Sequence, residues 1–148
     1  MVILGYRTGQ LGNRLFQYGH WLGNSWEYKY TLYNPSFDEY GGYFNRNAEN
    51  SIYEVKKTFL SFWIVRKTVL LIAKVVFKYM YLRQKNVVGN HWVRFYRIRD
   101  DEECDLGSHG GVRLRESTKY LVVQGWLYRD NVSWNRKMEQ IREFFALA

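Results

Sequence analysis

Residues 1–24 read MVILGYRTGQLGNRLFQYGHWLGN, and their hydrophobic period changes at a glycine-rich turn. The opening run MVILGY is short, apolar and rich in β-branched residues, which is typical of a buried strand. From Asn13 onward, Leu15, Tyr18 and Leu22 recur at the spacing of one helix face. The stretch therefore predicts a strand, a glycine turn and a helix, in that order.

A glycine turn that leads from a strand into a helix can hold an anion. The free backbone N–H groups of the first helical turn and the positive end of the helix dipole converge there. Gly9 and Gly12 can adopt backbone angles closed to other residues, while Asn13 can cap the helix or donate its amide to a ligand oxygen. A tight connection capped by Asn13 needs no ligand, and neither the dinucleotide fingerprint nor the P-loop pattern is present. Both interpretations of the turn stay open on these residues alone.

The rest of the chain alternates strand and helix patterns. Gly19 and Gly23 either allow close packing of the first helix or weaken its end. The pattern predicts a strand at 28–33, a surface loop that packs down at 34–50 and a long apolar helix at 58–85. It then predicts an irregular segment at 86–116 with one possible strand at 91–98, a strand at 119–128 and a helix at 133–148. The last helix has Ser133 as its expected N-cap and an apolar face of Trp134, Met138, Ile141 and Phe145. This alternation predicts an α/β domain with a parallel sheet and flanking helices.

Composition limits the possible functions of the chain. Its 148 residues have the length of one domain, and 47% hydrophobic residues with a single proline indicate a chain that folds. A formal net charge of +8 favours anionic partners. The single cysteine, Cys104, excludes an internal disulfide and a zinc cluster within the chain. The N-terminus has no signal-peptide pattern, so we expect a cytoplasmic protein.

Lysines divide the apolar segment at 58–85. At 100° per residue, Lys67, Lys74, Lys78 and Lys85 fall on nearly one line. Together with Arg66 they argue against a transmembrane span, because each cation at mid-bilayer costs about 2.5–3.5 kcal/mol. Two interpretations remain. We expect a helix buried by its own domain with the lysines as its solvated edge, and the alternative is a peripheral helix on an anionic membrane surface.

The longer string GQLGNRLFQY, residues Gly9–Tyr18, resembles the N-terminal signature of the α-1,2-fucosyltransferases, glycosyltransferase family 11. That signature is G-G-L-G-N-Q-hydrophobic-F-Q-Y-A, and it is matched here by Gly9, Leu11, Gly12, Asn13, Leu15, Phe16, Gln17 and Tyr18. Gln10, Arg14 and Gly19 differ from it. A second stretch, VVQGWLYRD, resembles the family's strand that ends in Gly-aromatic, through Gly125 and Trp126, with Tyr128 and Arg129 in place of the usual Gln-Ser.

The resemblance implies a Rossmann-like domain that forms the N-terminal, acceptor-side half of a GT-B enzyme. Enzymes of this family transfer fucose from GDP-fucose to a galactose hydroxyl with inversion and without a required metal or other cofactor. Residues 1–148 would be that half, with Gly9, Gly12, Asn13 and Arg14 near the sugar nucleotide. The apolar C-terminal residues suggest that this is part of a longer protein.

The family's donor motif, His-x-Arg-x-Gly-Asp, has no counterpart in the chain. The nearest stretch, HWVRFYRIRDD from His91 to Asp101, has a different spacing and precedes Gly125, so we interpret it as a basic strand or loop. We therefore expect no donor-binding domain here and no activity of the chain alone. The alternative function is a non-enzymatic basic module that binds an anionic membrane or polyanion.

Other candidate residues are weaker. His20, His91 and His109 lack the spacing of metal ligands. Asp38 and Glu39 could act as a base only with a partner domain beside them, and we expect a plain surface turn there instead. The acidic neighbours of Cys104 are expected to raise its pKa, which argues against a nucleophile. No nucleic-acid motif accompanies the positive charge, so we expect no nucleic-acid partner.

Overall fold

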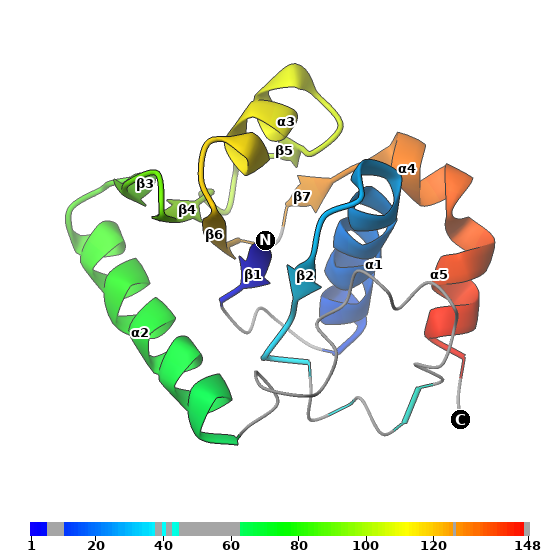
Figure 1. Ribbon diagram of the computed structural model, residues 1–148, viewed down its shortest axis with the longest axis horizontal. Helices are drawn as coiled ribbons and strands as arrows, with labels where there is room; N and C mark the ends of the chain where they lie inside the picture. The colour runs from blue at the N-terminus through cyan, green and yellow to red at the C-terminus, as the bar shows by residue number, and fades with distance from the viewer. Residues whose placement is uncertain (6–10, 38–39, 41–42, 45–62, 126, 147–148) are drawn as a thin grey trace.

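The computed structural model describes residues 1–5, 11–37, 40, 43–44, 63–125 and 127–146 (Figure 1). In chain order the elements are β1 (Val2–Leu4), α1 (Leu11–Tyr28), β2 (Leu32–Tyr33), α2 (Trp63–Leu82), β3 (Val87–Gly89), β4 (Val93–Arg97), β5 (Cys104–Asp105), α3 (His109–Glu116), β6 (Tyr120–Gln124), β7 (Tyr128–Arg129), α4 (Asn131–Arg136) and α5 (Met138–Phe144). The predicted strand and helix at the N-terminus are confirmed by β1 and α1, and residues 6–10 of the predicted turn between them lie outside the described residues.

Five strands form one sheet in the order β2-β1-β6-β4-β3. All neighbours are parallel except the edge pair of β3 and β4, which is antiparallel. In the centre of the sheet, Val122 of β6 pairs with Ile3 of β1 on one side and with Phe95 of β4 on the other. A second, two-stranded sheet joins β5 to β7. The predicted α/β class is confirmed, and the mostly parallel sheet is compatible with a Rossmann-like domain.

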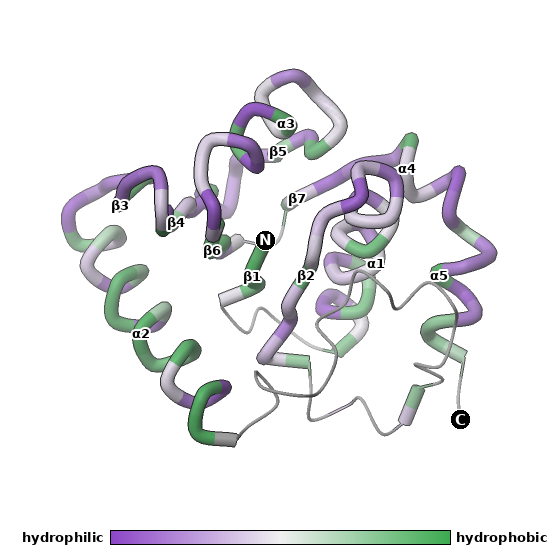
Figure 2. Tube along the Cα trace, viewed as in Figure 1, coloured by the Kyte–Doolittle hydropathy of each residue, from purple (hydrophilic) through white to green (hydrophobic). Residues whose placement is uncertain are grey.

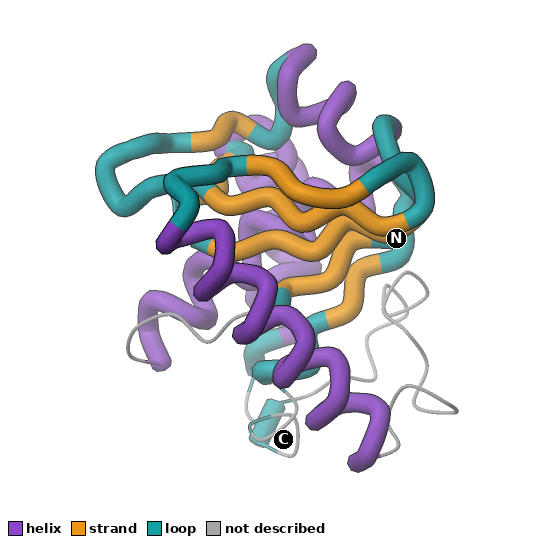
Figure 3. Tube along the Cα trace, turned by 90° about the vertical axis from the view of Figure 1, so that its left-hand side faces the viewer, coloured by secondary structure: helices purple, strands orange, loops and turns teal. Residues whose placement is uncertain are grey.

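Helices cover both faces of the sheet, with α2 on one side and α1, α4 and α5 on the other (Figure 1). Successive strand residues point to opposite faces. Val2 and Leu121 therefore join the core beneath α1, while Ile3 and Val122 join the core beneath α2. Figure 3 shows the strands side by side with α2 crossing in front of them.

Glycines bring α1 and α4 close together. A Cβ on Gly19 would overlap the ring of Trp134, and one on Gly23 would lie 3.2 Å from the backbone oxygen of Ser133. Both glycines are buried within α1. Of the two roles expected for them, close packing is the one that is confirmed.

The loop expected at 34–50 is described at its start, and residues 34–37 form a turn there, as expected. Phe37 is almost fully buried and packs on Tyr18, at 5.0 Å between ring centroids, so this part does pack down. Asp38 and Glu39 lie outside the described residues.

Within 86–116, the possible strand at 91–98 is confirmed by β4, and the expectation that the segment is otherwise irregular is wrong, because it also contains β3, β5 and α3. The helix, α3, has glycines at positions 110 and 111, which lower its intrinsic propensity. Two local features compensate. Ser108 caps the helix, since its side chain accepts a hydrogen bond from the N–H of Gly111 at 3.2 Å. A Cβ at position 111 would also lie 2.6 Å from the backbone oxygen of Leu106, so only glycine allows this approach.

The single C-terminal helix expected from Ser133 onward is two helices, α4 and α5, that meet at Lys137. The N-cap of α4 is Asp130 and not Ser133, whose own N–H donates to Asp130. The break also changes the buried face, because Phe144 is fully buried where the periodicity predicts Phe145.

The expectation that the apolar helix is buried is wrong for most of its surface. Only Ala73, Phe77 and Met80 of α2 are buried against the sheet. Its other sides are largely exposed among the residues that the structure describes. Within that same part of the chain, no helix combines the length and the apolar character that a membrane span requires.

Candidate functional site

The first turn of α1 holds the residues predicted to bind an anion. Gly12 and Asn13 are exposed there, and Arg14 is half-buried with its guanidinium carbon 5.8 Å from the centre of the Tyr40 ring. Gly9 lies outside the described residues. Asn13 is inside the helix, which begins at Leu11, so the expectation that it caps the helix is wrong.

Gly12 has no structural reason to be glycine in the part of the chain that the structure describes. Its backbone is helical and does not adopt the left-handed conformation, so the expected need for special backbone angles is not met at this position. No described atom lies within 4 Å of the place where a Cβ would stand. Glycine inside a helix costs about 1 kcal/mol relative to alanine. What glycine does provide at this point is open space beside the backbone amides.

A buried hydrogen bond joins the two stretches that carry the family resemblance. The side-chain amide of Gln17, on α1, donates to the backbone oxygen of Gly125, directly after β6. Gly125 has φ +126°, and a Cβ there would overlap Ile98, so the position requires glycine. The helix that follows the first strand is thus fixed to the carboxyl end of the central strand.

A second buried network fixes α1 to the start of α4. The side-chain amide of Asn24 donates to Asp130 Oδ2 at 2.6 Å, and the backbone N–H of Ser133 donates to Asp130 Oδ1 at 2.8 Å. Tyr30 completes the network by donating to Asn24 Oδ1 at 2.8 Å. Burial alone would raise the pKa of Asp130, but the hydrogen bonds from Ser133 and Asn24 lower it below its ordinary value. Asp130 is therefore an ionised structural cap.

His20 is a buried neutral histidine. Its Nδ1 accepts the backbone N–H of Asp130 at 3.0 Å, so the proton is on Nε2. Burial, and then the positive charge of Arg129, lower its pKa to about 4. Its ring packs on Trp134 with 4.6 Å between centroids. These contacts make His20 part of the interface between α1 and α4, and the described residues contain no group of three His, Cys, Asp or Glu side chains that could hold a metal ion.

The residues that replace the family's Gln-Ser have packing roles. Tyr128 is fully buried and packs on Trp21, at 5.0 Å between ring centroids. Arg129 lies over the exposed ring of Phe16, 4.9 Å from its centre. This cation–π contact covers one side of the first helix close to its N-terminal turn.

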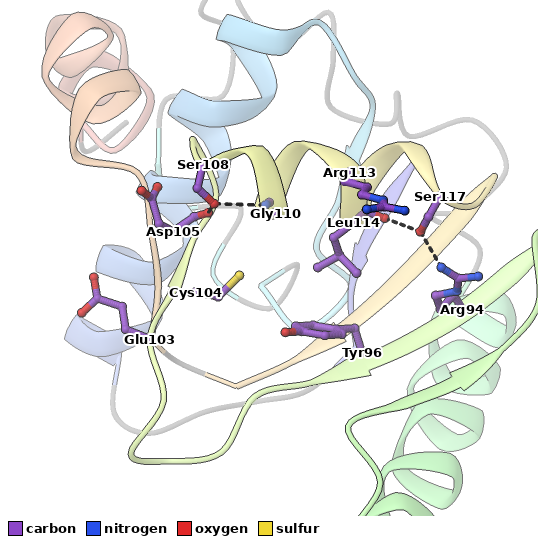
Figure 4. Close-up of a pocket in the computed structure, with 11 residues that line it drawn as sticks. Arg94, Tyr96, Glu103, Cys104, Asp105, Ser108, Gly110, Arg113, Leu114 and Ser117 are labelled. Atoms are coloured by element: carbon purple, nitrogen blue, oxygen red, sulfur yellow. Dashed lines mark hydrogen bonds between the residues drawn. The ribbon is translucent and has the colours of Figure 1, made fainter.

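A cavity of about 450 Å³ lies between α3, β4 and the segment of β5 (Figure 4). Glu103 and Asp105 lie at one end of it, and Arg94 and Arg113 at the other. Arg94 donates to Ser117 Oγ at 2.7 Å. The two ends of the cavity carry opposite charges. It therefore suits a polar ligand whose net charge is near zero better than it suits a diphosphate, which is strongly negative. Sequence patterns miss this cavity because they miss α3.

Cys104 lies in the wall of this cavity and is not activated. Burial, and then the charge of Asp105, raise the pKa of its thiol to about 11. The expected rise of the Cys104 pKa is confirmed, but its main cause is burial and not the acidic neighbours. A thiol with this pKa is protonated at neutral pH and is a poor nucleophile.

The stretch from His91 to Asp101, which resembles the donor motif only loosely, is mainly β4. Arg97 lies 5.1 Å from the centre of the Tyr81 ring of α2, and the backbone N–H of Arg99 donates to Glu102. The interpretation as a basic strand or loop is therefore confirmed, since β4 covers 93–97 and the residues on either side of it are not in a strand. Searches of protein-family models, curated proteins and solved structures found no match to this chain.

Proposed function

We propose that this chain is the acceptor-side domain of a glycosyltransferase of the GT-B kind that transfers fucose from GDP-fucose to a galactoside hydroxyl in α-1,2 linkage. The observation that carries the proposal is the hydrogen bond from Gln17 to Gly125. The two stretches that resemble the α-1,2-fucosyltransferases are 108 residues apart at this bond, yet they meet at the carboxyl end of neighbouring parallel strands. This edge is where open α/β sheets bind their ligands.

In this proposal, the first turn of α1 faces the diphosphate of the donor. The free N–H groups of the turn and the helix dipole favour a negative charge there. Asn13 is exposed and can donate its side-chain amide to a phosphate oxygen, and Gly12 leaves room for the ligand to approach the main chain. Arg14, one position further, supplies a positive charge to the same turn.

The chain alone is expected not to catalyse the transfer. In an inverting transfer, a base takes the proton of the acceptor hydroxyl while the bond between the sugar and GDP breaks. Both substrates must be held in line in a closed cleft, and positioning of this kind supplies a large part of the rate. In this proposal a separate donor-binding domain provides the second wall, and no catalytic residue is assigned to this chain.

The test is a titration of the ¹⁵N-labelled chain with GDP and with guanosine, followed by amide chemical shifts. The proposal expects shifts centred on Leu11–Arg14 with GDP and none there with guanosine. Asn13→Ala should weaken GDP binding by about ten- to hundredfold, because a hydrogen bond to a charged group contributes about 1.5–3 kcal/mol.

Asn135→Ala is the matched control, since Asn135 is also an exposed helical asparagine, on α4. It should leave GDP binding unchanged. Shifts that appear elsewhere, or equal shifts with guanosine, would contradict the proposed position of the diphosphate. Fucose transfer to a lactose acceptor by this chain alone would contradict the need for a second domain.

A further inference from the structure

The outer face of α2 is apolar. The helix packs on the sheet through Ala73, Phe77 and Met80. The opposite side carries a row of four exposed residues, Ile64, Leu71, Val75 and Leu82, with exposed fractions of 56%, 61%, 61% and 69%. Their spacing of seven, four and seven residues places them on one line along the helix. Ile72 and Tyr79 are exposed beside this row.

A second row, of lysines, follows the same face. Lys67, Lys74 and Lys78 have the same spacing of seven and four, so they lie next to the apolar row, and all three are exposed. Arg83 and Lys85 are exposed just past the end of the helix. Figure 2 shows the resulting helix as mostly hydrophobic with hydrophilic positions at intervals. No Asp or Glu occurs in the sequence between Val55 and Arg99, so α2 itself carries cations and no acidic side chain.

We propose that this face of α2, defined by Ile64, Leu71, Val75 and Leu82 with the adjacent lysines, docks on the surface of a bilayer that contains anionic lipids. The apolar row enters the boundary between headgroups and acyl chains, and the lysine stems lie along the apolar surface with their charges at the headgroup phosphates. The helix lies in the plane of the membrane and does not cross it.

Charge complementarity favours an anionic bilayer over a second copy of the chain. A helix of 20 residues is about 30 Å long, and its cations are spread along this length. A lipid surface offers negative charge all along such a line. A second copy would bring an identical lysine row and a further +8 net charge to the same contact, which opposes association. This inference is independent of the proposed transfer reaction, since α2 covers the opposite face of the sheet from α1.

The test is flotation of the chain with vesicles of phosphatidylcholine, with and without about one third phosphatidylglycerol, at low and high salt. The proposal expects binding to the anionic vesicles only, with a loss at high salt because the charges are screened. Binding of equal strength to vesicles of phosphatidylcholine alone would overturn it.

Two pairs of variants locate the contact. Lys74→Gln with Lys78→Gln should weaken binding about thirtyfold, which is about fivefold for each lysine near an anionic surface. The control, Arg136→Gln with Arg142→Gln, removes the same charge from exposed positions on α4 and α5 and should have little effect. Equal losses in both pairs would mean nonspecific attraction and would overturn the proposal.

The apolar contribution is tested by Leu71→Ser with Val75→Ser, and Val132→Ser is the control, because Val132 is 60% exposed on α4. All these side chains are exposed, so thermal unfolding should be almost unchanged. Vesicle binding should be lost in the α2 variant alone. A concentration-dependent dimer that this variant dissociates, without vesicle binding in the parent chain, would identify the face as a protein interface and overturn the proposal.

Discussion

Gly12 and Gly19 lie in the same helix, and their surroundings differ completely. Gly12 is exposed with open space around it, whereas Gly19 is buried against the ring of Trp134. Gly12→Ala should therefore raise the free energy of unfolding by up to about 1 kcal/mol, because alanine is the better helix former and meets no described atom. Urea unfolding measures this change. If the diphosphate approaches the main chain here, the same variant should bind GDP more weakly, although it is more stable.

If Gly12→Ala were more stable but bound GDP as tightly as the parent chain, the methyl group would not obstruct the ligand. That result would count against a diphosphate site at Gly12. Asn135→Ala again serves as the control for binding.

Gly19→Ala should have the opposite effect on stability. The added methyl group would overlap the Trp134 ring, so α1 and α4 must move apart or the ring must leave its position. Overpacking of this kind costs about 1–3 kcal/mol. Urea unfolding measures the loss. Equal stability of Gly19→Ala and the parent chain would show that the two helices are not in close contact.

Single residues also mark the limit of what the sequence could predict. The helical spacing of the apolar residues correctly predicts that Tyr18 and Leu22 are in the core, because apolar residues on one face of a helix are normally buried. It cannot predict that Gln17 reaches Gly125, because that bond depends on the order of the strands. It also cannot distinguish Gly12, which no described contact requires, from Gly125, whose conformation requires it.

At the scale of elements, Asp130 both caps α4 and holds α1. Its carboxylate accepts from the N–H of Ser133 and from the buried side chain of Asn24. Asp130→Ala should lower the free energy of unfolding by about 2–4 kcal/mol, because the cap is lost and the Asn24 amide is left without its partner.

The matched control is Ser108→Ala, which removes the cap of α3 without leaving a buried side-chain amide unpaired. Ser108→Ala should lower the free energy of unfolding by about 1 kcal/mol. Both variants are measured by urea unfolding. Equal losses in the two variants would mean that Asp130 acts as a cap only and does not connect the helices.

The elements that sequence patterns predict well are those with a strong period and a clear boundary. The strand at β1 and the helix at α1 are of this kind. The helix α3 is missed because Gly110 and Gly111 lower its intrinsic propensity, although Ser108 before it is an N-cap residue of the kind that a sequence does show. The break between α4 and α5 is missed as well, since nothing in the composition near Lys137 marks the end of a helix.

For the whole molecule, the alternation of strands and helices is enough to predict an α/β domain, because only a few layer arrangements bury both kinds of element. The position of α2 is not predictable in this way. Its composition is typical of a buried helix, but the sheet offers it only one side, where Ala73, Phe77 and Met80 pack. The apolar outer row is therefore exposed in the described fold, and composition alone, which cannot report how many sides of a helix the sheet covers, favoured the wrong interpretation.

The stability of the whole domain should depend on pH through His20. Its pKa is about 4 in the fold, because the ring is buried and Arg129 is nearby, and it rises to about 6.5 on unfolding. Unfolding therefore takes up a proton between these two pH values, so the free energy of unfolding falls as the pH is lowered from 6.5 toward 4. The expected loss between pH 7 and pH 5 is about 2 kcal/mol. Asp130, whose pKa is lowered, contributes only below about pH 4, since its stabilisation is lost as it becomes protonated.

Urea unfolding of the parent chain and of His20→Gln at pH 7 and pH 5 tests this dependence. Glutamine does not titrate, so the difference between the two pH values should almost disappear in His20→Gln, even if this variant is less stable at both. His91→Gln is the control, because His91 is exposed and its replacement should leave the difference in place. If the parent chain and His20→Gln lost the same stability between pH 7 and pH 5, another group would be responsible, and His20 could not be the neutral, buried contact between α1 and α4 on which this fold depends.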